Sequence, residues 1–311
     1  MPSALTTILP IFALIFAGGL MRRIGVLGPL ATRELNRFVV YLALPALLLD
    51  IVAHARWEQL WQPGFIIAFG AGSLIVFALT IWMQLRRARH LADSAIDGLN
   101  SSYANTGFIG FPLALAILGP ESMAPTLIAT LITVCILFAV AIVLIETGLQ
   151  AEKRWWHLAL KAAGSLCRNP LLVAPVLGAL VPLCGLSVPT PAETFLKLLG
   201  GAASPCALVA LGLFVAERRT ETKPEARSTF ILVISKLVLQ PGLTWILADK
   251  VLALPSSLSH LAVLMAALPT GTGPFMLAEF YGREAKVASN VILISTVLSL
   301  FTLSIYLYVS R

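Results

Sequence analysis

The sequence predicts an all-α membrane protein with ten transmembrane helices. Of its 311 residues, 58% are hydrophobic and only 12% are charged, whereas a soluble domain is about half apolar and a quarter charged. The apolar residues form blocks close to the roughly 20 residues that a helix needs to cross the hydrocarbon core. Proline and glycine interrupt two of these blocks at matching places. These observations indicate a bundle of spans in which two helices are broken at membrane depth.

Hydropathy divides the chain into ten apolar segments that short polar linkers separate. They cover residues 4–21, 35–53, 64–85, 96–118, 123–147, 170–185, 192–216, 228–248, 259–281 and 287–309. No positive stretch precedes the first segment, and Arg22 and Arg23 follow it. We therefore expect a retained span and not a cleaved secretory signal. No linker is long enough to form a soluble domain.

Positive charge is concentrated in alternate linkers. Sixteen of the 22 Lys and Arg residues lie in the five linkers 22–34, 86–95, 148–169, 217–227 and 282–286. By the positive-inside rule these linkers face the cytoplasm, which places both termini on the periplasmic or extracellular side. The lipid bilayer is thus the expected surroundings, and the net charge of +7 needs no nucleic-acid partner to explain it.

The third basic linker divides the chain into two halves of five spans. The first half is 1–150, the linker is 151–169, and the second half is 170–311, with no separate soluble domain. Pro45 and Pro205 are separated by nearly the same number of residues as Pro112 and Pro274. Because five is odd, the second half enters the membrane from the opposite side. The sequence therefore predicts an inverted-topology repeat, which many secondary transporters use.

The fourth segment in each half contains a stretch that is rich in glycine and proline. The first runs from Tyr103 to Pro112 (YANTGFIGFP) and the second from Leu268 to Phe275 (LPTGTGPF). Proline removes a backbone donor and glycine relaxes the backbone, so both stretches are predicted to break their helices. Unwound backbone at membrane depth must be buried in protein or line a wet cavity. We therefore expect the two breaks to cross and to form a site.

An anion suits such a crossing. The half-helices that follow the breaks would present free N–H groups and positive dipole ends, and neutral side chains could complete a carboxylate site. The candidate substrate-binding residues are Asn105, Thr106, Gly107, Thr270, Gly271, Thr272 and Gly273, and the candidate break and crossover residues are Pro112, Pro269 and Pro274. The alternative is that these residues only kink or pack helices, and Asn105 by itself could simply bond a neighbouring helix.

Ionisable residues within a bilayer are functional candidates. Glu279 and Asp50 are the candidates for binding a coupling proton, although Asp50 and Glu146 fall at the ends of their spans. Lys236 is expected to extend to the cytoplasmic surface. Neither an enzyme nor a metal site is predicted, because the HExxH, GxSxG and GxxxxGKS patterns are absent and the four histidines lie in linkers or at span ends.

These motifs resemble the auxin efflux carrier family, which includes plant auxin exporters and bacterial carriers of small acids such as malate and malonate. The similarity covers essentially the whole chain. The motifs that carry it are LNRF (35–38) and LPA (44–46) in the second span, NTGF (105–108) with Gly110 and Pro112, RNP (168–170), LGLF (211–214) and LPTGTGPF (268–275).

The resemblance implies ten spans in two inverted halves, with broken, crossing helices 4 and 9. It implies a scaffold of spans 1, 2, 6 and 7, and a transport part that moves as an elevator. Asn105 corresponds to a substrate-binding residue of the family and Pro112 and Pro274 to its crossover prolines, while Asn169 is a further candidate contact. The plant exporters have a long central loop and charged residues early in span 3, and this chain lacks both. We therefore expect a prokaryotic form in the bacterial inner membrane that does not carry auxin.

The expected function is secondary active transport of small organic anions, such as mono- or dicarboxylates, by alternating access. No cofactor is expected, and the coupling ion could be H⁺ or Na⁺. The alternative is a non-transporting receptor or sensor for the same anions. The small residues from Gly200 to Ser204 could form a homodimer contact or serve close packing within one chain.

Overall fold

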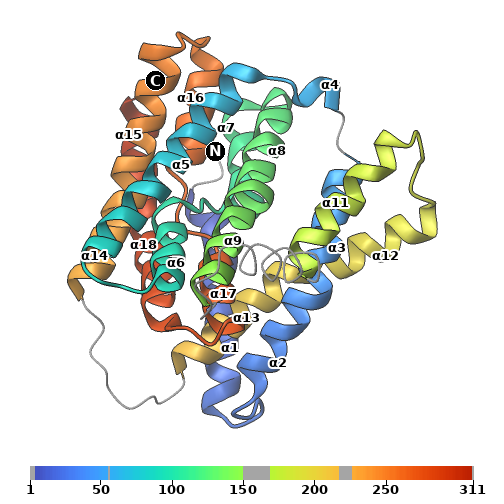
Figure 1. The fold of residues 1–311 in the computed structure, drawn as a ribbon, viewed down its shortest axis with the longest axis vertical. Helices are drawn as coiled ribbons and strands as arrows, with labels where there is room; N and C mark the ends of the chain where they lie inside the picture. Colours follow the sequence, from blue (N-terminus) through green and yellow to red (C-terminus); the bar gives the residue numbers. More distant parts are fainter. Residues whose placement is uncertain (1–3, 55–56, 150–168, 217–225, 310–311) are drawn as a thin grey trace.

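The computed structural model describes residues 4–54, 57–149, 169–216 and 226–309. All the regular elements within these ranges are helices (Figure 1). Both chain ends lie outside them, as does the predicted central linker 151–169 apart from Asn169. By length and composition, the described residues include six stretches that could cross a membrane: Ala31–Ala53, Pro63–Arg86, Pro120–Leu149, Thr190–Ala216, Arg227–Val251 and Ala285–Tyr308. Pro170–Leu183 and Ser256–Ala266 are shorter apolar helices.

The helices follow one another along the chain. Before the predicted central linker they are α1 (Ala4–Arg23), α2 (Ala31–Phe38), α3 (Leu44–Ala53), α4 (Trp57–Leu60), α5 (Pro63–Arg86), α6 (Leu91–Ser102), α7 (Phe111–Leu118), α8 (Met123–Leu131) and α9 (Phe138–Leu149). After it they are α11 (Pro170–Leu183), α12 (Thr190–Gly201), α13 (Ala203–Ala216), α14 (Ala226–Ile234), α15 (Gln240–Trp245), α16 (Ser256–Ala266), α17 (Gly273–Phe280) and α18 (Ala285–Val309).

Three π-helical turns within these spans have a common cause. The turns Val39–Ala43, Thr106–Gly110 and Ser235–Leu239 each end two residues before a proline, at 45, 112 and 241 respectively. Proline has no N–H to bond the carbonyl four residues earlier, and its ring crowds that carbonyl. The helix therefore widens by one residue before each proline and then continues.

The helices pack in two groups (Figure 1). In the first group, α1 and α2 pack on α13, while α3 packs on α11 and α12. The second group is built around α5, α6, α15 and α16, and includes α8, α9, α14, α17 and α18. The groups meet at α17, where Asn36 Nδ2 of α2 donates a 3.1 Å hydrogen bond to the Met276 carbonyl and the Phe214 and Phe275 rings lie 5.1 Å apart.

Glycine lets α1 and α13 touch through their backbones. A Cβ added at Gly18 would overlap the Val209 carbonyl of α13, and one added at Gly212 would overlap the Ile15 carbonyl of α1. Such close contact of small residues is typical of helix pairs in membranes. The contact joins the first half of the chain to the second.

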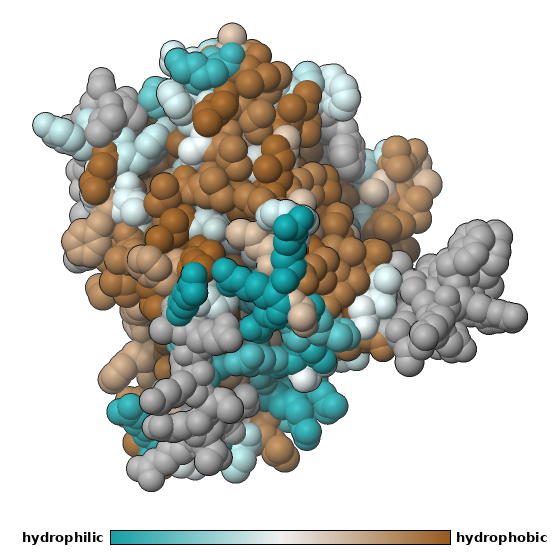
Figure 2. All heavy atoms as spheres, turned by 60° about the vertical axis from the view of Figure 1, so that its left-hand side comes forward, coloured by the Kyte–Doolittle hydropathy of each residue, from teal (hydrophilic) through white to brown (hydrophobic). Residues whose placement is uncertain are grey.

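The outer surface is largely apolar. Large side chains such as Phe16, Trp82 and Phe301 are exposed, and Figure 2 shows hydrophobic atoms over most of one face, with hydrophilic atoms gathered toward its lower end. A soluble protein rarely exposes so much contiguous apolar surface. This pattern is typical of a protein whose sides contact lipid.

Candidate functional site

Two helical spans of the second group are interrupted, and the two interruptions lie side by side in the structure. α6 ends at Ser102, and residues 103–105 leave the helix before the π turn Thr106–Gly110. α16 ends at Ala266, and residues 267–272 are not helical before α17 begins. The breaks pair with each other: the Asn105 N–H donates to the Pro269 carbonyl (2.9 Å) and the Gly271 N–H to the Tyr103 carbonyl (3.0 Å), with an antiparallel bridge between Ala104 and Thr270. The unwound backbones thereby satisfy each other away from water.

The first break is shorter than the sequence analysis predicted. Residues 106–112 are helical, first as a π turn and then as α7, so Pro112 lies near the start of that helix. Pro274 likewise lies in the first turn of α17. Pro274 is tolerated there because its missing N–H has no intrahelical partner in a first turn, whereas Pro112 follows a π turn that accommodates it within a continuous helical stretch. Pro269 alone of the three crossover candidates lies inside a break.

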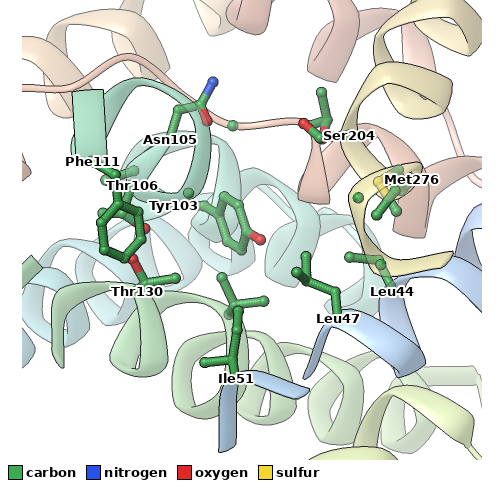
Figure 3. Close-up of a pocket in the computed structure, with 18 residues that line it drawn as sticks. Leu44, Leu47, Ile51, Tyr103, Asn105, Thr106, Phe111, Thr130, Ser204 and Met276 are labelled. Carbon is green, nitrogen blue, oxygen red and sulfur yellow. The ribbon is translucent and has the colours of Figure 1, made fainter. Parts of the chain in front are cut away.

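A cavity of about 260 Å³ lies against the crossing, between the two groups of helices. The second group lines it with Tyr103, Ala104, Asn105, Thr106, Gly107, Phe111, Thr130, Val134, Gly271, Thr272 and Met276. The first group lines it with Leu44, Leu47, Ile51, Gly200, Gly201, Ala203 and Ser204. In Figure 3 Leu44, Leu47 and Ser204 lie across from Tyr103, Asn105 and Thr106. Every lining residue among those described is uncharged.

Five predicted substrate-binding residues therefore line one cavity, namely Asn105, Thr106, Gly107, Gly271 and Thr272. Thr270 and Gly273 lie next to it but have other contacts. Thr270 is buried, its hydroxyl donates to the Asn100 carbonyl (2.8 Å), and its N–H donates to Ser295 Oγ (3.1 Å). Gly273 makes room for the Tyr103 ring, since a Cβ there would lie 2.7 Å from it. Thr270 thus ties the second break to α6 and α18, and Gly273 lets the Tyr103 ring pack against the break.

Asn169 lies outside the cavity lining. Its Oδ1 accepts from the Leu171 N–H (3.0 Å), and its Nδ2 donates to the Tyr281 hydroxyl (3.2 Å). It is the N-cap of α11, with Pro170 at the first helical position. Asn followed by Pro is a common helix start, so the motif has a local structural role here.

The two predicted coupling carboxylates also lie outside the lining. Asp50, near the end of α3, has its Oδ1 3.0 Å from His54 Nδ1. Glu279 lies in the last turn of α17 and is partly buried. A third carboxylate, Asp97 of α6, was missed by the sequence analysis. It is buried and accepts a hydrogen bond of 2.6 Å from Gln84 Nε2, with Arg89 Nε 3.7 Å away.

The prediction for Lys236 was wrong. The side chain does not reach the surface but is fully buried, because its ammonium group finds hydrogen-bond acceptors inside the protein. Nζ donates to Gln240 Oε1 (2.5 Å) and to the Ala266 carbonyl (2.7 Å). The second acceptor is a backbone atom thirty residues further along the chain.

Two hydroxyl groups in the cavity wall lack a partner. Thr106 Oγ1 and Ser204 Oγ have no hydrogen bond to any described group, although both are buried and line the cavity. Buried polar atoms are nearly always bonded to protein, water or a ligand. These hydroxyls, from opposite groups of helices, have unused hydrogen-bonding capacity beside the cavity, and each would have to turn toward it to bond a molecule there. Ser204 lies in the run of small residues from Gly200, which here packs within the chain: a Cβ on Gly200 would lie 2.9 Å from Leu47 Cα.

Apolar helices, two paired breaks and an internal cavity are typical of a membrane transporter. The chain belongs to the auxin efflux carrier family of membrane transporters: the family model described as "Membrane transport protein" matches residues 3–307. This confirms the resemblance seen in the sequence, and makes the chain a multi-pass membrane protein.

The chain is also similar in sequence to individual transporters. The chain is 33% identical over 306 residues to "Putative malonate transporter" of Rhizobium meliloti (strain 1021), a match that covers 98% of this chain and 95% of the relative. It is 24% identical over 310 residues to "Uncharacterized transporter YfdV" of Escherichia coli (strain K12), covering 98% and 96%. It is 28% identical over 153 residues to "Auxin efflux carrier component 8" of Arabidopsis thaliana, covering 48% of this chain and 41% of the relative.

Proposed function

We propose that this chain is a secondary active transporter of small carboxylates, which binds a carboxylate group in the cavity at the helix crossing. The observation that carries the proposal is the pair of unpartnered hydroxyls, Thr106 Oγ1 and Ser204 Oγ, in an uncharged cavity wall. A carboxylate accepts hydrogen bonds only, and both hydroxyls can donate one. Asn105 adds an amide group on the same wall.

The helix ends at the crossing favour negative charge. The π turn that leads into α7 and the helix α17 both begin at the crossing, and their first residues, including Thr106, line the cavity or adjoin it. Each helix N-terminus carries the equivalent of about half a positive charge. Two such ends match about one carboxylate without an Arg or Lys side chain, and this moderate attraction allows release.

The size and lining of the cavity favour a small acid. Pockets for drug-sized ligands occupy about 300–1,000 Å³, and this cavity, at about 260 Å³, is slightly smaller. Leu44, Leu47 and Ile51 give it an apolar side that suits a short hydrocarbon chain. The 33% identity to the relative named for malonate transport supports a mono- or dicarboxylate of about that size.

The position of the cavity supports alternating access. One wall belongs to the first group of helices, which corresponds to the expected scaffold of spans 1, 2, 6 and 7, and the other to the second group. Movement of the second group against the first, as an elevator, would carry the site from one side of the membrane to the other. We propose ten spans in two inverted halves, in a bacterial inner membrane with both termini periplasmic.

Counterflow tests the proposal and separates a carrier from a receptor. Proteoliposomes loaded with unlabelled malonate should accumulate labelled malonate transiently above equilibrium, because a carrier exchanges substrate across the membrane. Liposomes without protein give the background, and acetate and succinate in place of malonate test the size limit. Malonate binding without exchange would instead support a receptor. Absence of both binding and exchange for all three acids would contradict the proposal.

A further inference from the structure

Lys236 places its side-chain amino group inside the membrane-spanning bundle. The residue lies in the π turn Ser235–Leu239, and none of its side chain is exposed. Within the described part of the chain, its two hydrogen bonds go to neutral oxygens, the Gln240 amide and the Ala266 carbonyl. The buried carboxylate of Asp97 is bonded to Gln84 and Asn100 instead. A buried ammonium needs compensation, so its surroundings must supply negative potential.

The Ala266 carbonyl supplies part of that potential. Ala266 is the last residue of α16, the helix that ends at the second break. The carbonyl groups at a helix C-terminus have no intrahelical partner, and together they act as about half a negative charge. The ammonium of Lys236, 2.7 Å from this carbonyl, therefore neutralises the end of one interrupted helix.

Gln240 extends the same contact to the other interrupted helix. Its Oε1 accepts from Lys236 Nζ (2.5 Å), and its Nε2 donates to the carbonyl of Ser102 (2.9 Å), the last residue of α6. Nε2 also donates to Ser73 Oγ (2.9 Å), so the amide is fixed in orientation. One ammonium and one amide thus bridge the C-terminal ends of both broken helices, and neither Lys236 nor Gln240 lines the cavity.

We propose that the ammonium group of Lys236 takes the place of a bound inorganic cation at the helix crossing. Two C-terminal ends of about half a negative charge each are offset by its single positive charge. The two N-terminal ends are then left uncompensated for the substrate carboxylate. Lys236 is a positioning residue, and substrate binding by this carrier needs no Na⁺ at the crossing. The part of the inference that concerns substrate rests on the proposed function.

Thermal unfolding of the purified, detergent-solubilised protein tests the cation site without any substrate. A cation that binds the folded state raises the Tm. The wild type should unfold at the same Tm in choline, sodium and methylammonium chloride. Lys236→Ala opens a space with two acceptor groups, so its Tm should be lower in choline and rise in methylammonium, an ion small enough to enter. Lys250→Ala is the matched control, because Lys250 lies in the next π turn of the same span and is exposed.

Lys236→Met gives a second variant that keeps the side-chain volume. The thioether fills the space, so its Tm should be equal in all three salts. A specific rise of the wild-type Tm in sodium chloride would overturn the inference, as would a Lys236→Ala Tm that does not change between choline and methylammonium. If Lys236→Ala does not fold, the wild-type measurement in sodium chloride still tests the inference, because a specific rise of the Tm there overturns it.

Malonate affinity tests the link to substrate. In choline chloride, Lys236→Ala and Lys236→Met should bind malonate about tenfold more weakly than the wild type, because the positive charge that offsets the helix C-termini is lost. Methylammonium should restore most of the affinity to Lys236→Ala and none to Lys236→Met. Wild-type affinity in both variants would contradict the positioning role. If the wild type binds no acid, the proposed function fails, while the Tm measurements still decide whether Lys236 replaces a cation.

Discussion

The backbone N–H of Asn105 donates a hydrogen bond of 2.9 Å to the carbonyl of Pro269, and this contact joins two segments that are far apart in the sequence. Pro269 has no N–H to give back, and the reciprocal bond runs instead from Gly271 to Tyr103 (3.0 Å). Backbone atoms therefore hold the crossing together. The side chain of Asn105 is left for the cavity, and its contribution can be measured without breaking the crossing.

Asn105→Ala should weaken malonate binding while the protein stays folded. Loss of one hydrogen bond to a ligand, worth about 1 kcal/mol, corresponds to a roughly fivefold weaker affinity. The affinity would be measured by thermal shift over a malonate titration, and the fold by size-exclusion chromatography. Equal affinity in the variant and the wild type would show that the amide does not contact substrate.

Thr106→Val should have opposite effects on stability and on binding. The Thr106 hydroxyl is unpartnered and its residue is only 1% exposed, and burying such a group costs about 1–3 kcal/mol. The isosteric valine removes that cost, so the Tm without ligand should stay equal or rise. Malonate affinity should fall because a donor is lost.

Thr130→Val is the matched control for Thr106→Val. Thr130 also lines the cavity, but its hydroxyl already donates to the Thr126 carbonyl (2.9 Å). Its replacement should change malonate affinity much less. A larger loss of affinity in Thr130→Val than in Thr106→Val would contradict the assignment of the free hydroxyl to substrate.

Gly273→Ala should destabilise the crossing. The added Cβ would lie 2.7 Å from the ring of Tyr103, which is itself buried, and overpacking of this kind costs about 1–3 kcal/mol. Gly201→Ala provides the comparison, since Gly201 lines the same cavity and a Cβ there would meet nothing within 4 Å. The Tm of Gly273→Ala should be clearly lower than the Tm of Gly201→Ala. Similar Tm values would mean that the Tyr103 ring can move aside.

Asn169→Ala should reduce stability and leave substrate affinity unchanged. Replacing an Asn N-cap by Ala costs about 1 kcal/mol, and Asn169 also bonds Tyr281. Asn169→Asp retains the acceptor for the Leu171 N–H and should keep more of the stability. A fall in malonate affinity out of proportion to the change in Tm would return Asn169 to the list of substrate contacts.

Local patterns in the sequence were sufficient to locate the breaks. Proline and glycine have strong effects on the backbone within one turn, so the stretches at Tyr103 and Pro269 could be recognised without a structure. The same local rules misjudged the extent of the first break, because a helix can absorb Pro112 by widening into a π turn. The candidate contact at Asn169 came from the family resemblance and stays a prediction; the structure adds that Asn169 caps α11.

The second wall of the cavity and the place of Lys236 depend on tertiary contacts. Leu47 and Ser204 have only apolar or small neighbours in the sequence, in residues 44–49 and 199–208, and nothing local indicates that they face Asn105. Lys236 reaches a backbone carbonyl at Ala266, and any residue type could supply that acceptor. A general tendency of Lys to extend to the surface was therefore the only available guide, and it failed.

The backbone contact between α1 and α13 has a consequence for biosynthesis. α1 leaves the ribosome well before α13, so the surface around Gly212 on which it packs is made only after much more of the chain has been translated. Until then the glycine-containing face of α1 is in contact with lipid. If each half of the chain is expressed alone, it should insert into the membrane but be degraded readily by proteases. Co-expression of the two halves in the same bilayer should make both resistant to proteolysis.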